Sequence, residues 1–338
     1  MTFTIRLQND DRVFTAREDE TVLEAALRSG LVLPYGCRNG SCGSCKGKLL
    51  GGEIVYRDDS VTGITPEERR AGYALFCQAL PRSDLLIETR RMNIEGFPPI
   101  HRLPCRVDSL EKCSDSILRL FLKLPSTERL LFLPGQHIDV LLANGERRSY
   151  SLANAPHVRD HLELHVRHYP GGHFSEYAFT SLKEKNLLRI EGPLGTFTLR
   201  EDSSRPLIMV AGGTGFAPIK SIIEHILYRK LGREVYLYWG ARTVRDLYLH
   251  DLARQWAADH SHIRYIPVLS EQKPEEKWDG RSGLVHAAVL EDFPDLGGHE
   301  VYTCGPPPMV HAVRDTFVQH GLSADFIYSD SFESARGV

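Results

Sequence analysis

Apolar and polar residues alternate in short runs over the first part of the chain, and one segment changes to helical spacing. Apolar side chains at 3–7 and 13–14 are placed as in a β-hairpin, and those at 22–27 recur at the spacing of a helix. Acidic residues before that helix and Gly30 after it fit the usual helix boundaries. The pattern also predicts a strand, a helix start and a last strand at 54–56, 65–68 and 85–88. A small α+β unit is expected here.

Two other patterns of apolar and polar residues follow along the chain. Short strands separated by Pro-Gly and Gly-Gly turns predict an antiparallel barrel, with strands at 117–124, 137–142, 162–166 and 187–190. Farther on, apolar strands alternate with helical patterns, which predicts a parallel sheet with crossover helices. Its strands are expected at 207–210, 235–238, 263–268 and 301–303.

Length and composition agree with a multidomain α+β and α/β protein. The chain has 338 residues, of which 42% are hydrophobic and 25% charged, and it shows no internal repeat. We expect domains at 1–92, 103–199 and 200–338, with the Gly- and Pro-containing segment 93–102 as a linker.

Charge and apolar runs exclude several classes of protein. A net charge of −3 argues against a nucleic-acid-binding protein, which would carry a basic excess. The apolar stretch at 206–219 is too short and too rich in glycine to cross a bilayer. Charges among the first residues do not fit a signal peptide, so a cytoplasmic protein is expected.

Cysteine spacing gives the strongest chemical signal. Of seven cysteines, Cys37, Cys42 and Cys45 follow the pattern Cys-x4-Cys-x2-Cys, and Cys77 comes later. This spacing is typical of a plant-type 2Fe-2S cluster, in which each iron takes two thiolates. A zinc site would favour two Cys-x2-Cys knuckles, whereas here the one such pair, Cys42 and Cys45, follows a third cysteine and is joined by a single distant one. Cys105 and Cys113 have no partner at ligand spacing and are assigned no role.

A flavin signature lies in the barrel segment. In the run Arg148-Ser149-Tyr150-Ser151, the arginine can pair with a pyrophosphate, the ring can stack on an isoalloxazine, and the Ser151 hydroxyl can hydrogen-bond its reactive nitrogen. An ordinary strand would explain this short run nearly as well. A Gly-Gly turn that opens a helix adds main-chain N–H groups for phosphates. The further candidate residues for the flavin site are His165, Val166, Arg167, Gly171, Gly172, His173, Phe174 and Ser175.

A nucleotide signature follows the strand at 207–210. Its glycine-rich turn lets the backbone approach a pyrophosphate and comprises Gly212, Gly213, Thr214, Gly215 and Ala217. A second turn, expected to expose Cys304 at the carboxyl edge of the sheet, adds Gly305, Pro306 and Met309. Gly240 and Arg242 stand where an acidic residue is usual, so the sequence leaves open whether the protein uses NADH or NADPH.

These motifs resemble two known families. Residues 1–92 resemble the plant-type ferredoxin domain, which implies a β-grasp fold with Cys77 near a helix end. Residues 103–338 resemble the ferredoxin-NADP reductase superfamily, which implies an FAD-binding barrel and a Rossmann-like nucleotide-binding domain. The resemblance assigns Arg148, Tyr150 and Ser151 to FAD, and it places Phe332 as a C-terminal aromatic near the isoalloxazine. The whole chain is similar to reductase components of bacterial oxygenases and, more closely, to reductases of the CDP-6-deoxy-glucoseen type.

An electron-transfer role follows from this cofactor set. A nicotinamide donates two electrons together and a 2Fe-2S cluster accepts one, so a flavin must stand between them. We expect Ser151 and Cys304 to act at the reacting atoms, with Ser151 on flavin N5 and Cys304 orienting the nicotinamide. His165, His168 and His173 lack the pairing of a zinc or Rieske site and are expected to contact the flavin or the surface.

The expected partner is a separate iron-dependent enzyme, either a dehydrase or an oxygenase. It should dock near the cluster loop, around Arg38, Asn39 and Ser41. Residues 1–92 carry 13 basic and 13 acidic side chains, so no strongly acidic docking face is indicated. A redox-sensing module is the alternative from another functional class. Resemblance favours NADH over NADPH, although Arg242 could meet a 2′-phosphate.

Overall fold

The chain forms two compact units, and each is described by itself. The structure is a computed structural model that describes residues 1–8, 11–90, 96–272, 275 and 277–332. Unit 1 is Met1–Phe97 and unit 2 is Pro98–Val338. The first residues of the expected linker, 93–95, lie outside the described residues, and strand β8 already begins at His101.

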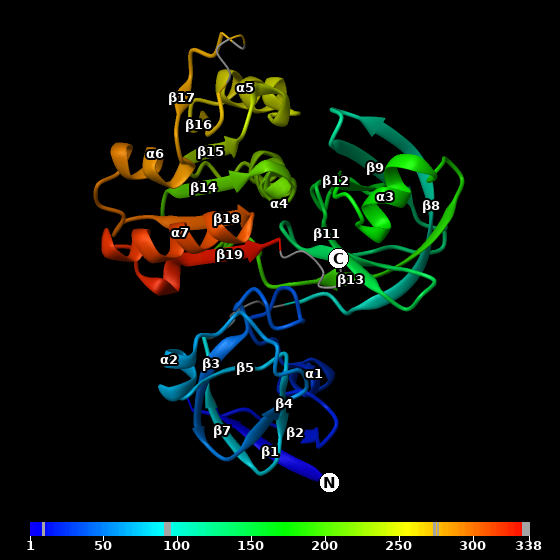
Figure 1. Ribbon diagram of the computed structural model, residues 1–338, viewed down its shortest axis with the longest axis vertical. Coiled ribbons are helices and arrows are strands. Elements are labelled where there is room, and N and C mark those ends of the chain that lie inside the picture. The colour runs from blue at the N-terminus through cyan, green and yellow to red at the C-terminus, as the bar shows by residue number, and fades with distance from the viewer. Residues whose placement is uncertain (9–10, 91–95, 273–274, 276, 333–338) are drawn as a thin grey trace. The chain divides into compact units, whose positions relative to one another are not determined.

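Unit 1 has a five-stranded mixed sheet in the order β2-β1-β7-β3-β5, with a small β4-β6 pair beside it (Figure 1). Its strands are β1 (Thr2–Leu7), β2 (Val13–Arg17), β3 (Lys46–Gly51), β4 (Ile54–Tyr56), β5 (Tyr73–Leu75), β6 (Ala79–Pro81) and β7 (Leu85–Glu88). The predicted hairpin and helix are confirmed as β1-β2 and α1 (Val22–Arg28). A capping box between Thr21 and Glu24 starts α1, which buries Val22 and Leu23.

The barrel of unit 2 is antiparallel throughout, as its turn-rich sequence predicts. Its strand order is β11-β10-β13-β8-β9-β12, and a bridge between Leu152 and Leu164 joins the two outer strands. The elements are β8 (His101–Lys112), β9 (Ile117–Lys123), β10 (His137–Leu141), β11 (Arg147–Ser151), β12 (Leu162–Arg167), α3 (His173–Thr180) and β13 (Leu187–Leu194). Closure of the sheet leaves few free edges and a core of alternating aliphatic side chains.

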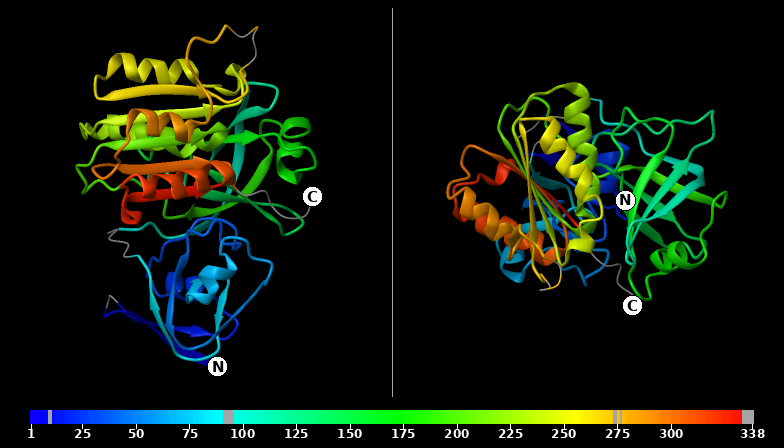
Figure 2. Two further views of the ribbon diagram at one scale, coloured as in Figure 1. Left: turned by 60° about the vertical axis from the view of Figure 1, so that its left-hand side comes forward. Right: turned by 90° about the horizontal axis from the view of Figure 1, so that it is seen from above.

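The second part of unit 2 is a parallel sheet in the order β17-β16-β15-β14-β18-β19. Figure 2 shows helices on both of its faces. The strands are β14 (Leu207–Gly212), β15 (Val235–Ala241), β16 (Ile263–Leu269), β17 (Arg281–Ser282), β18 (Glu300–Gly305) and β19 (Ile327–Ser331). The helices are α4 (Phe216–Arg229), α5 (His250–Asp259), α6 (Val285–Asp292) and α7 (Pro307–Gln319). The predicted alternation of strand and helix is confirmed.

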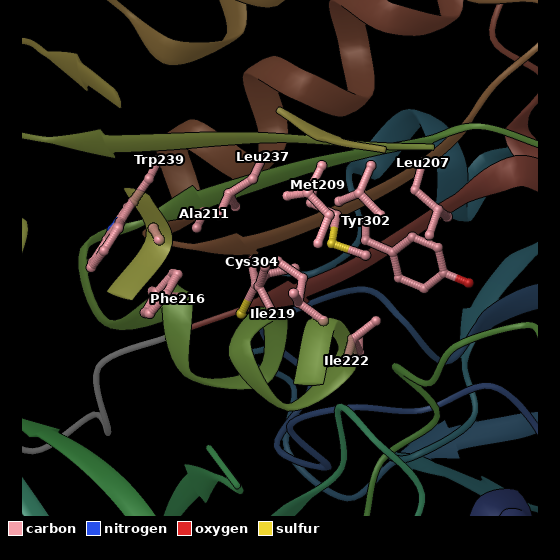
Figure 3. Close-up of a cluster of buried hydrophobic side chains, with 14 of the residues drawn as sticks. Leu207, Met209, Ala211, Phe216, Ile219, Ile222, Leu237, Trp239, Tyr302 and Cys304 are labelled. Carbon is pink, nitrogen blue, oxygen red and sulfur yellow. The ribbon is translucent and has the colours of Figure 1, made fainter. Parts of the chain in front are cut away.

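Two apolar layers hold this sheet in place. Helices α4 and α5 cover one face, where Ile219 and Ile222 pack on Met209 and Leu237 (Figure 3). Helices α6 and α7 cover the other face. Because both faces are buried, the central strand β14 consists of small and apolar residues without alternation. No helix in the described part of the chain is long and apolar enough to span a bilayer.

Candidate functional site

The cysteine loop turns back on itself through left-handed backbone conformations. Arg38, Gly40 and Gly43 have φ angles of 60°, 80° and 73°. Glycine adopts such angles without strain, which explains the glycines between the cysteines. The Gln78 amide donates to the carbonyl of Arg38 at 2.8 Å and fixes the outer end of the loop.

The predicted cluster ligands lie as two pairs. The Cys37 amide points at Cys42 Sγ at 3.5 Å, and the Cys42 amide points at Cys37 Sγ at 3.3 Å. A hydrogen bond with the Cys42 thiol lowers the pKa of Cys37 to about 7. Cys45 forms the second pair by a hydrogen bond with Cys77, which raises the pKa of Cys45.

This paired arrangement fits a two-iron cluster. Each iron of a 2Fe-2S cluster takes two thiolates, and backbone N–H groups commonly point at the sulfurs. Among the residues that the structure describes, no three His, Cys, Asp or Glu side chains gather as ligands of one ion. Two pairs of cysteines are the feature that a two-iron group needs.

The position of Cys77 beside a helix end agrees with the one that the resemblance implied. Cys77 lies in the turn between β5 and β6, and the Leu23 amide in the first turn of α1 donates to the carbonyl of the preceding Phe76 at 2.9 Å. The helix that comes before it in the sequence, α2 (Pro66–Arg70), ends before β5. Pairing of β5 with β3 brings Cys77 to the cysteine loop, since β3 starts directly after Cys45. The fourth thiol is thus positioned by the pairing of two strands that are distant in the sequence. Sequence spacing does not reveal this pairing.

Gly63 is a further loop residue that the sequence analysis missed. Its amide donates to the carbonyl of Gly40 at 2.9 Å. A Cβ atom at Gly63 would lie 2.7 Å from the amide nitrogen of Gly43 and 2.9 Å from the carbonyl oxygen of Ser41. The segment before α2 thus packs backbone to backbone on the cysteine loop. The dipeptide Thr62-Gly63 carries no spacing signal that would have identified it.

Tyr150 and Ser151 lie at the end of β11 and supply the ring and the hydroxyl that the sequence predicts for flavin binding. The ring of Tyr150 packs at a tilt on Phe174, with centroids 5.3 Å apart, and burial raises its pKa. Ser151 is 5% exposed, and no side-chain hydrogen bond of Ser151 is found among the described residues. Its hydroxyl is therefore available to donate to, or accept from, a bound group.

The structure brings two of the predicted flavin-site residues, Arg148 and His173, together on one carboxylate. Arg148 Nη2 and His173 Nδ1 both lie 2.7 Å from Oε2 of Glu146. The hydrogen bond with His173 holds the pKa of Glu146 below its ordinary value. A carboxylate therefore already lies between the Arg148 guanidinium and the His173 ring. A pyrophosphate could replace this exposed carboxylate, which the sequence analysis did not identify.

Residues 169–175 form a closed turn before α3. The Ser175 hydroxyl accepts from the Tyr169 amide at 3.2 Å and donates to its carbonyl at 3.1 Å. A Cβ atom at Gly172 would lie 2.6 Å from that hydroxyl, and Gly171 has a φ of 76°. Ser175 thus shapes the turn with its side chain. The uncapped amides at the start of α3 stay available for a phosphate.

The three residues of the run His165-Val166-Arg167 on β12 contact three different parts of unit 2. Val166 is fully buried in the barrel core. His165 is also buried, and its ring binds Glu163 and Tyr248 rather than facing a surface. Arg167 reaches the glycine-rich turn, where a Cβ atom at Gly213 would lie 2.8 Å from its Nη1 atom.

Three glycines let the two nucleotide turns touch. A Cβ atom at Gly215 would overlap the carbonyl of Cys304, and one at Gly212 would lie 2.7 Å from Pro306 Cδ and from Met309 Sδ. Gly305 has a φ of 146°, and its own Cβ would lie 2.8 Å from the Gly212 carbonyl. Thr214 and Ala217 are buried in the same turn. These turns end β14 and β18 at the carboxyl edge of the sheet, where parallel sheets bind ligands.

Cys304 is buried, so the expectation that its turn exposes it is wrong. Figure 3 shows its side chain beside Ile219 of α4, and its exposed fraction is 0%. Burial and the charge of Asp330 raise the pKa of the thiol well above its ordinary value. A neutral, packed thiol is suited to orienting a neighbouring ring. Phe332 lies next to this strand, since its amide donates to the Gly305 carbonyl at 2.9 Å.

Beyond β15, Arg242 is paired with an acid. Its Nε atom lies 3.6 Å from Glu271 Oε1, and the Glu271 amide donates to the Arg242 carbonyl at 2.9 Å. Both side chains are exposed. A Cβ atom at Gly240 would lie 2.9 Å from Val285 Cβ, so α6 can approach the strand only at a glycine. Glu271 was not singled out from the sequence because it follows a different strand, β16.

The described residues fit the three groups that the motifs imply. When bound, FAD accepts two electrons from a nicotinamide nucleotide and passes them singly to a 2Fe-2S cluster. The four cysteines would hold the cluster, and β11 with the turn before α3 would hold the flavin. The turns at 212–217 and 304–309 would hold the nucleotide, with the Cys304 side chain buried at the base of the second turn.

Three family models match consecutive parts of the chain. They are the 2Fe-2S iron-sulfur cluster binding domain over residues 5–82, the oxidoreductase FAD-binding domain over 104–199 and the oxidoreductase NAD-binding domain over 209–315. The predicted cofactors are thereby confirmed.

Relatives match over nearly the whole chain. The CDP-6-deoxy-L-threo-D-glycero-4-hexulose-3-dehydrase reductase of Yersinia pestis is 40% identical, covering 99% of this chain and 100% of the relative. Reductase component 1 of the terephthalate 1,2-dioxygenase of Comamonas is 37% identical, covering 99% and 98%. The crystal structure of the Amycolatopsis reductase GcoB matches with a TM-score of 0.80 and 33% identity over 98% of each chain. The chain belongs to the ferredoxin-NAD(P) reductase superfamily, as an electron-transfer reductase with 2Fe-2S, FAD and NAD domains.

Proposed function

We propose that this reductase passes electrons from NADH to a separate dehydrase that acts on a nucleotide-linked hexulose. The single observation behind this choice is the full-length match at 40% identity to a hexulose-3-dehydrase reductase. The match to a dioxygenase reductase component, at 37%, also spans nearly the whole chain. A terminal enzyme as partner is common to both relatives, and the dehydrase is the specific proposal.

Electrons leave the protein at the outer end of the cysteine loop. Cys37 is partly exposed, whereas Cys42, Cys45 and Cys77 are at most 4% exposed. Arg38 is partly exposed and Asn39 is exposed beside Cys37. Ser41 is buried, and its amide donates to Asn39 Oδ1, so it supports the loop instead of offering a contact. A partner would therefore dock over Cys37, Arg38 and Asn39.

NADH is the proposed electron donor. The charge of Arg242 is compensated by Glu271, which stands at the end of the adjacent strand. A 2′-phosphate brought to this edge would meet the Glu271 carboxylate, and like charges repel, whereas a ribose hydroxyl could donate to it. Replacing Glu271 by glutamine should improve kcat/KM for NADPH about tenfold and change that for NADH little. Equal use of both nucleotides by the parent protein would contradict the assignment.

The acceptor is tested by reconstitution under anaerobic conditions. The reduced protein is mixed in turn with a purified nucleotide-hexulose dehydrase and with a ring-hydroxylating oxygenase component. Re-oxidation of the 2Fe-2S absorption bands is followed, together with product formation. We expect rapid re-oxidation by the dehydrase and slow re-oxidation by the oxygenase component. The reverse order would assign the chain to an oxygenase.

An Asn39→Asp variant in the cysteine loop and an Asp325→Asn variant in unit 2 separate docking from reduction. Both should retain the parent rate of ferricyanide reduction by NADH, because neither residue lies at the flavin or nucleotide turns. Only Asn39→Asp should alter the rate with the dehydrase. A protein that oxidises NADH slowly with every acceptor, including ferricyanide, would favour the redox-sensing alternative.

A further inference from the structure

A group of buried and half-buried polar side chains connects the barrel to the nucleotide-binding part of unit 2. The group, here named the Glu163 clamp, consists of Arg119, Glu163 and His165 from the barrel and Lys220 and Tyr248 from the nucleotide-binding part. The side chains of Glu163, His165 and Lys220 are only 3%, 0% and 6% exposed. No sequence motif predicts that these side chains meet between the two parts.

Each oxygen of Glu163 is bound by a cation or a ring N–H. Oε1 accepts from Arg119 Nε at 2.8 Å and from His165 Nε2 at 3.0 Å. Oε2 accepts from Lys220 Nζ at 2.9 Å. The Lys220 ammonium also donates to the carbonyl of Ala153 at 3.2 Å. Helix α4 thus places the Lys220 side chain against β12 and against the segment that follows β11.

A second link runs through His165. Its Nε2–H donates to the Glu163 carboxylate, so Nδ1 accepts from the Tyr248 hydroxyl at 2.7 Å. Burial lowers the pKa of His165, which favours this neutral ring. Next to Lys220, the Ser221 hydroxyl donates to the carbonyl of Asn154 at 2.8 Å. The contact is therefore specified by directed hydrogen bonds as well as by charge.

The clamp continues to the glycine-rich turn through aromatic contacts. Tyr248 stands edge-on to Trp239, with centroids 5.3 Å apart. Trp239 stacks on Phe216 at 3.8 Å, as Figure 3 shows, and its Nε1–H donates to the carbonyl of Gly213 at 3.0 Å. A continuous path of packed side chains joins Glu163 in the barrel to the turn that holds the nucleotide.

Stability alone does not explain the buried ion pair between Glu163 and Lys220. Transferring ions from water into a protein interior costs several kcal/mol each, and apolar replacements of a buried ion group are often neutral or stabilising. Directed polar contacts do, however, specify one relative position of two packed surfaces, because any other position loses the hydrogen bonds from Lys220 to Glu163 and from Tyr248 to His165. Within its own part, Glu163 keeps Arg119 and His165, and Lys220 keeps Glu224 at 2.9 Å. Reduction of a barrel-bound flavin by a nucleotide on the adjacent sheet depends steeply on that position.

We infer that the Glu163 clamp fixes the glycine-rich turn relative to the flavin-binding strand β11 and so sets the rate of flavin reduction by NADH. Glu163, Lys220 and Tyr248 are positioning residues, since none of them is placed at a reacting atom. The inference holds for any terminal acceptor, because flavin reduction precedes electron delivery.

The first test removes one hydrogen bond and has a matched control. Tyr248→Phe deletes the hydroxyl that binds His165. Tyr265→Phe deletes a similar hydroxyl, 3.0 Å from His250 Nδ1, that does not reach the barrel. In stopped-flow experiments on holoenzyme at saturating NADH, flavin reduction should be about tenfold slower in Tyr248→Phe, with unchanged FAD content. Tyr265→Phe should react at the parent rate. Equal slowing in both variants, or in neither, would overturn the inference.

The second test uses the charged pair and a readout other than turnover. Lys220→Met breaks the interdomain pair, and Arg233→Met breaks a buried pair with Glu300 that lies 3.0 Å apart within the nucleotide-binding part. Hydrogen–deuterium exchange of the amides at 213–221 should be about fivefold faster in Lys220→Met, since a hydrogen bond contributes on the order of 1 kcal/mol. Arg233→Met should leave these amides protected to the parent level.

The variants Tyr248→Phe and Tyr265→Phe provide the test if the Lys220 and Arg233 variants do not fold. Tyr248→Phe removes one oxygen atom and leaves every charge paired, so the folded holoenzyme should be recovered. In that variant exchange at 213–221 should also accelerate, whereas Tyr265→Phe should not change it. Parent-like exchange together with a parent-like rate in Tyr248→Phe would show that the clamp does not position the turn.

Discussion

Replacing Gly63 by alanine should remove the iron-sulfur cluster while the flavin and nucleotide parts stay functional. The new Cβ atom would lie 2.7 Å from the Gly43 nitrogen and 3.0 Å from the Gly40 oxygen, and ordinary contact begins at 3.4 Å. Relief therefore needs shifts of about 0.4–0.7 Å (3.4 − 3.0 and 3.4 − 2.7). The neighbours are backbone atoms between the ligands Cys37 and Cys45, so no side chain can rotate away.

Cluster ligands tolerate much less displacement than this. Metal–ligand distances in proteins stay within about 0.2 Å of their preferred values. Moreover, the hydrogen bond from the Gly63 amide to the Gly40 carbonyl, at 2.9 Å, holds the two segments together. Disturbing groups that support metal ligands commonly costs about 10- to 100-fold in affinity. We expect Gly63→Ala to contain less than about a tenth of the parent iron.

The assay compares cluster content with flavin function in the same preparation. Iron and acid-labile sulfide are measured per FAD, and NADH oxidation is measured with ferricyanide and with cytochrome c. Ferricyanide reduction should persist, and cytochrome c reduction should fall with the cluster. Gly51→Ala is the control within unit 1, since its nearest neighbour would be Leu86 Cβ at 3.6 Å. Full iron and sulfide content in Gly63→Ala would refute the steric reasoning.

Three other perturbations address unit 2 and the cluster. Gly215→Ala places a Cβ atom against the Cys304 carbonyl, so NADH should no longer reduce the flavin, whereas dithionite still should. Gly298→Ala is the control, because no atom of the described residues beyond its chain neighbours lies within 4 Å of its new Cβ, and it should behave as the parent. Burial would raise the pKa of Glu163, but His165, Lys220 and Arg119 hold this pKa well below 4.5. The ionised carboxylate therefore stabilises the folded protein above pH 4.5, and this contribution is lost on acidification. Chemical unfolding should show a weaker loss of stability at acidic pH in Glu163→Gln than in the parent. Removing the cluster with a chelator should abolish cytochrome c reduction and leave ferricyanide reduction unchanged.

Part of the site could be predicted because its chemistry is local in sequence. The cysteines at 37, 42 and 45 are close enough along the chain that one loop must bring them together. Likewise, a glycine-rich run between an apolar strand and a helix needs only its neighbours to form a nucleotide turn. Matches to the iron-sulfur, FAD and NAD domain models confirm the cofactors that these runs predicted.

Other site features depend on contacts between segments that are distant in sequence. Cys77 joins the loop through pairing of β5 with β3, and Gly63 is required because two backbones touch. Cys304 is buried because α4 covers its strand, although its turn signal suggested exposure. No periodicity or motif encodes such contacts.

By itself, the sequence determined the order of domains, their strand and helix types, and the cofactors, because periodicity and ligand spacing act over a few residues. Only the tertiary structure decided which charges meet. Glu163 on β12, Lys220 on α4 and Tyr248 before α5 are far apart in the chain, and each is an unremarkable polar residue in its own segment. Burial makes them a group, since a charge removed from water must find its partners wherever the fold brings them.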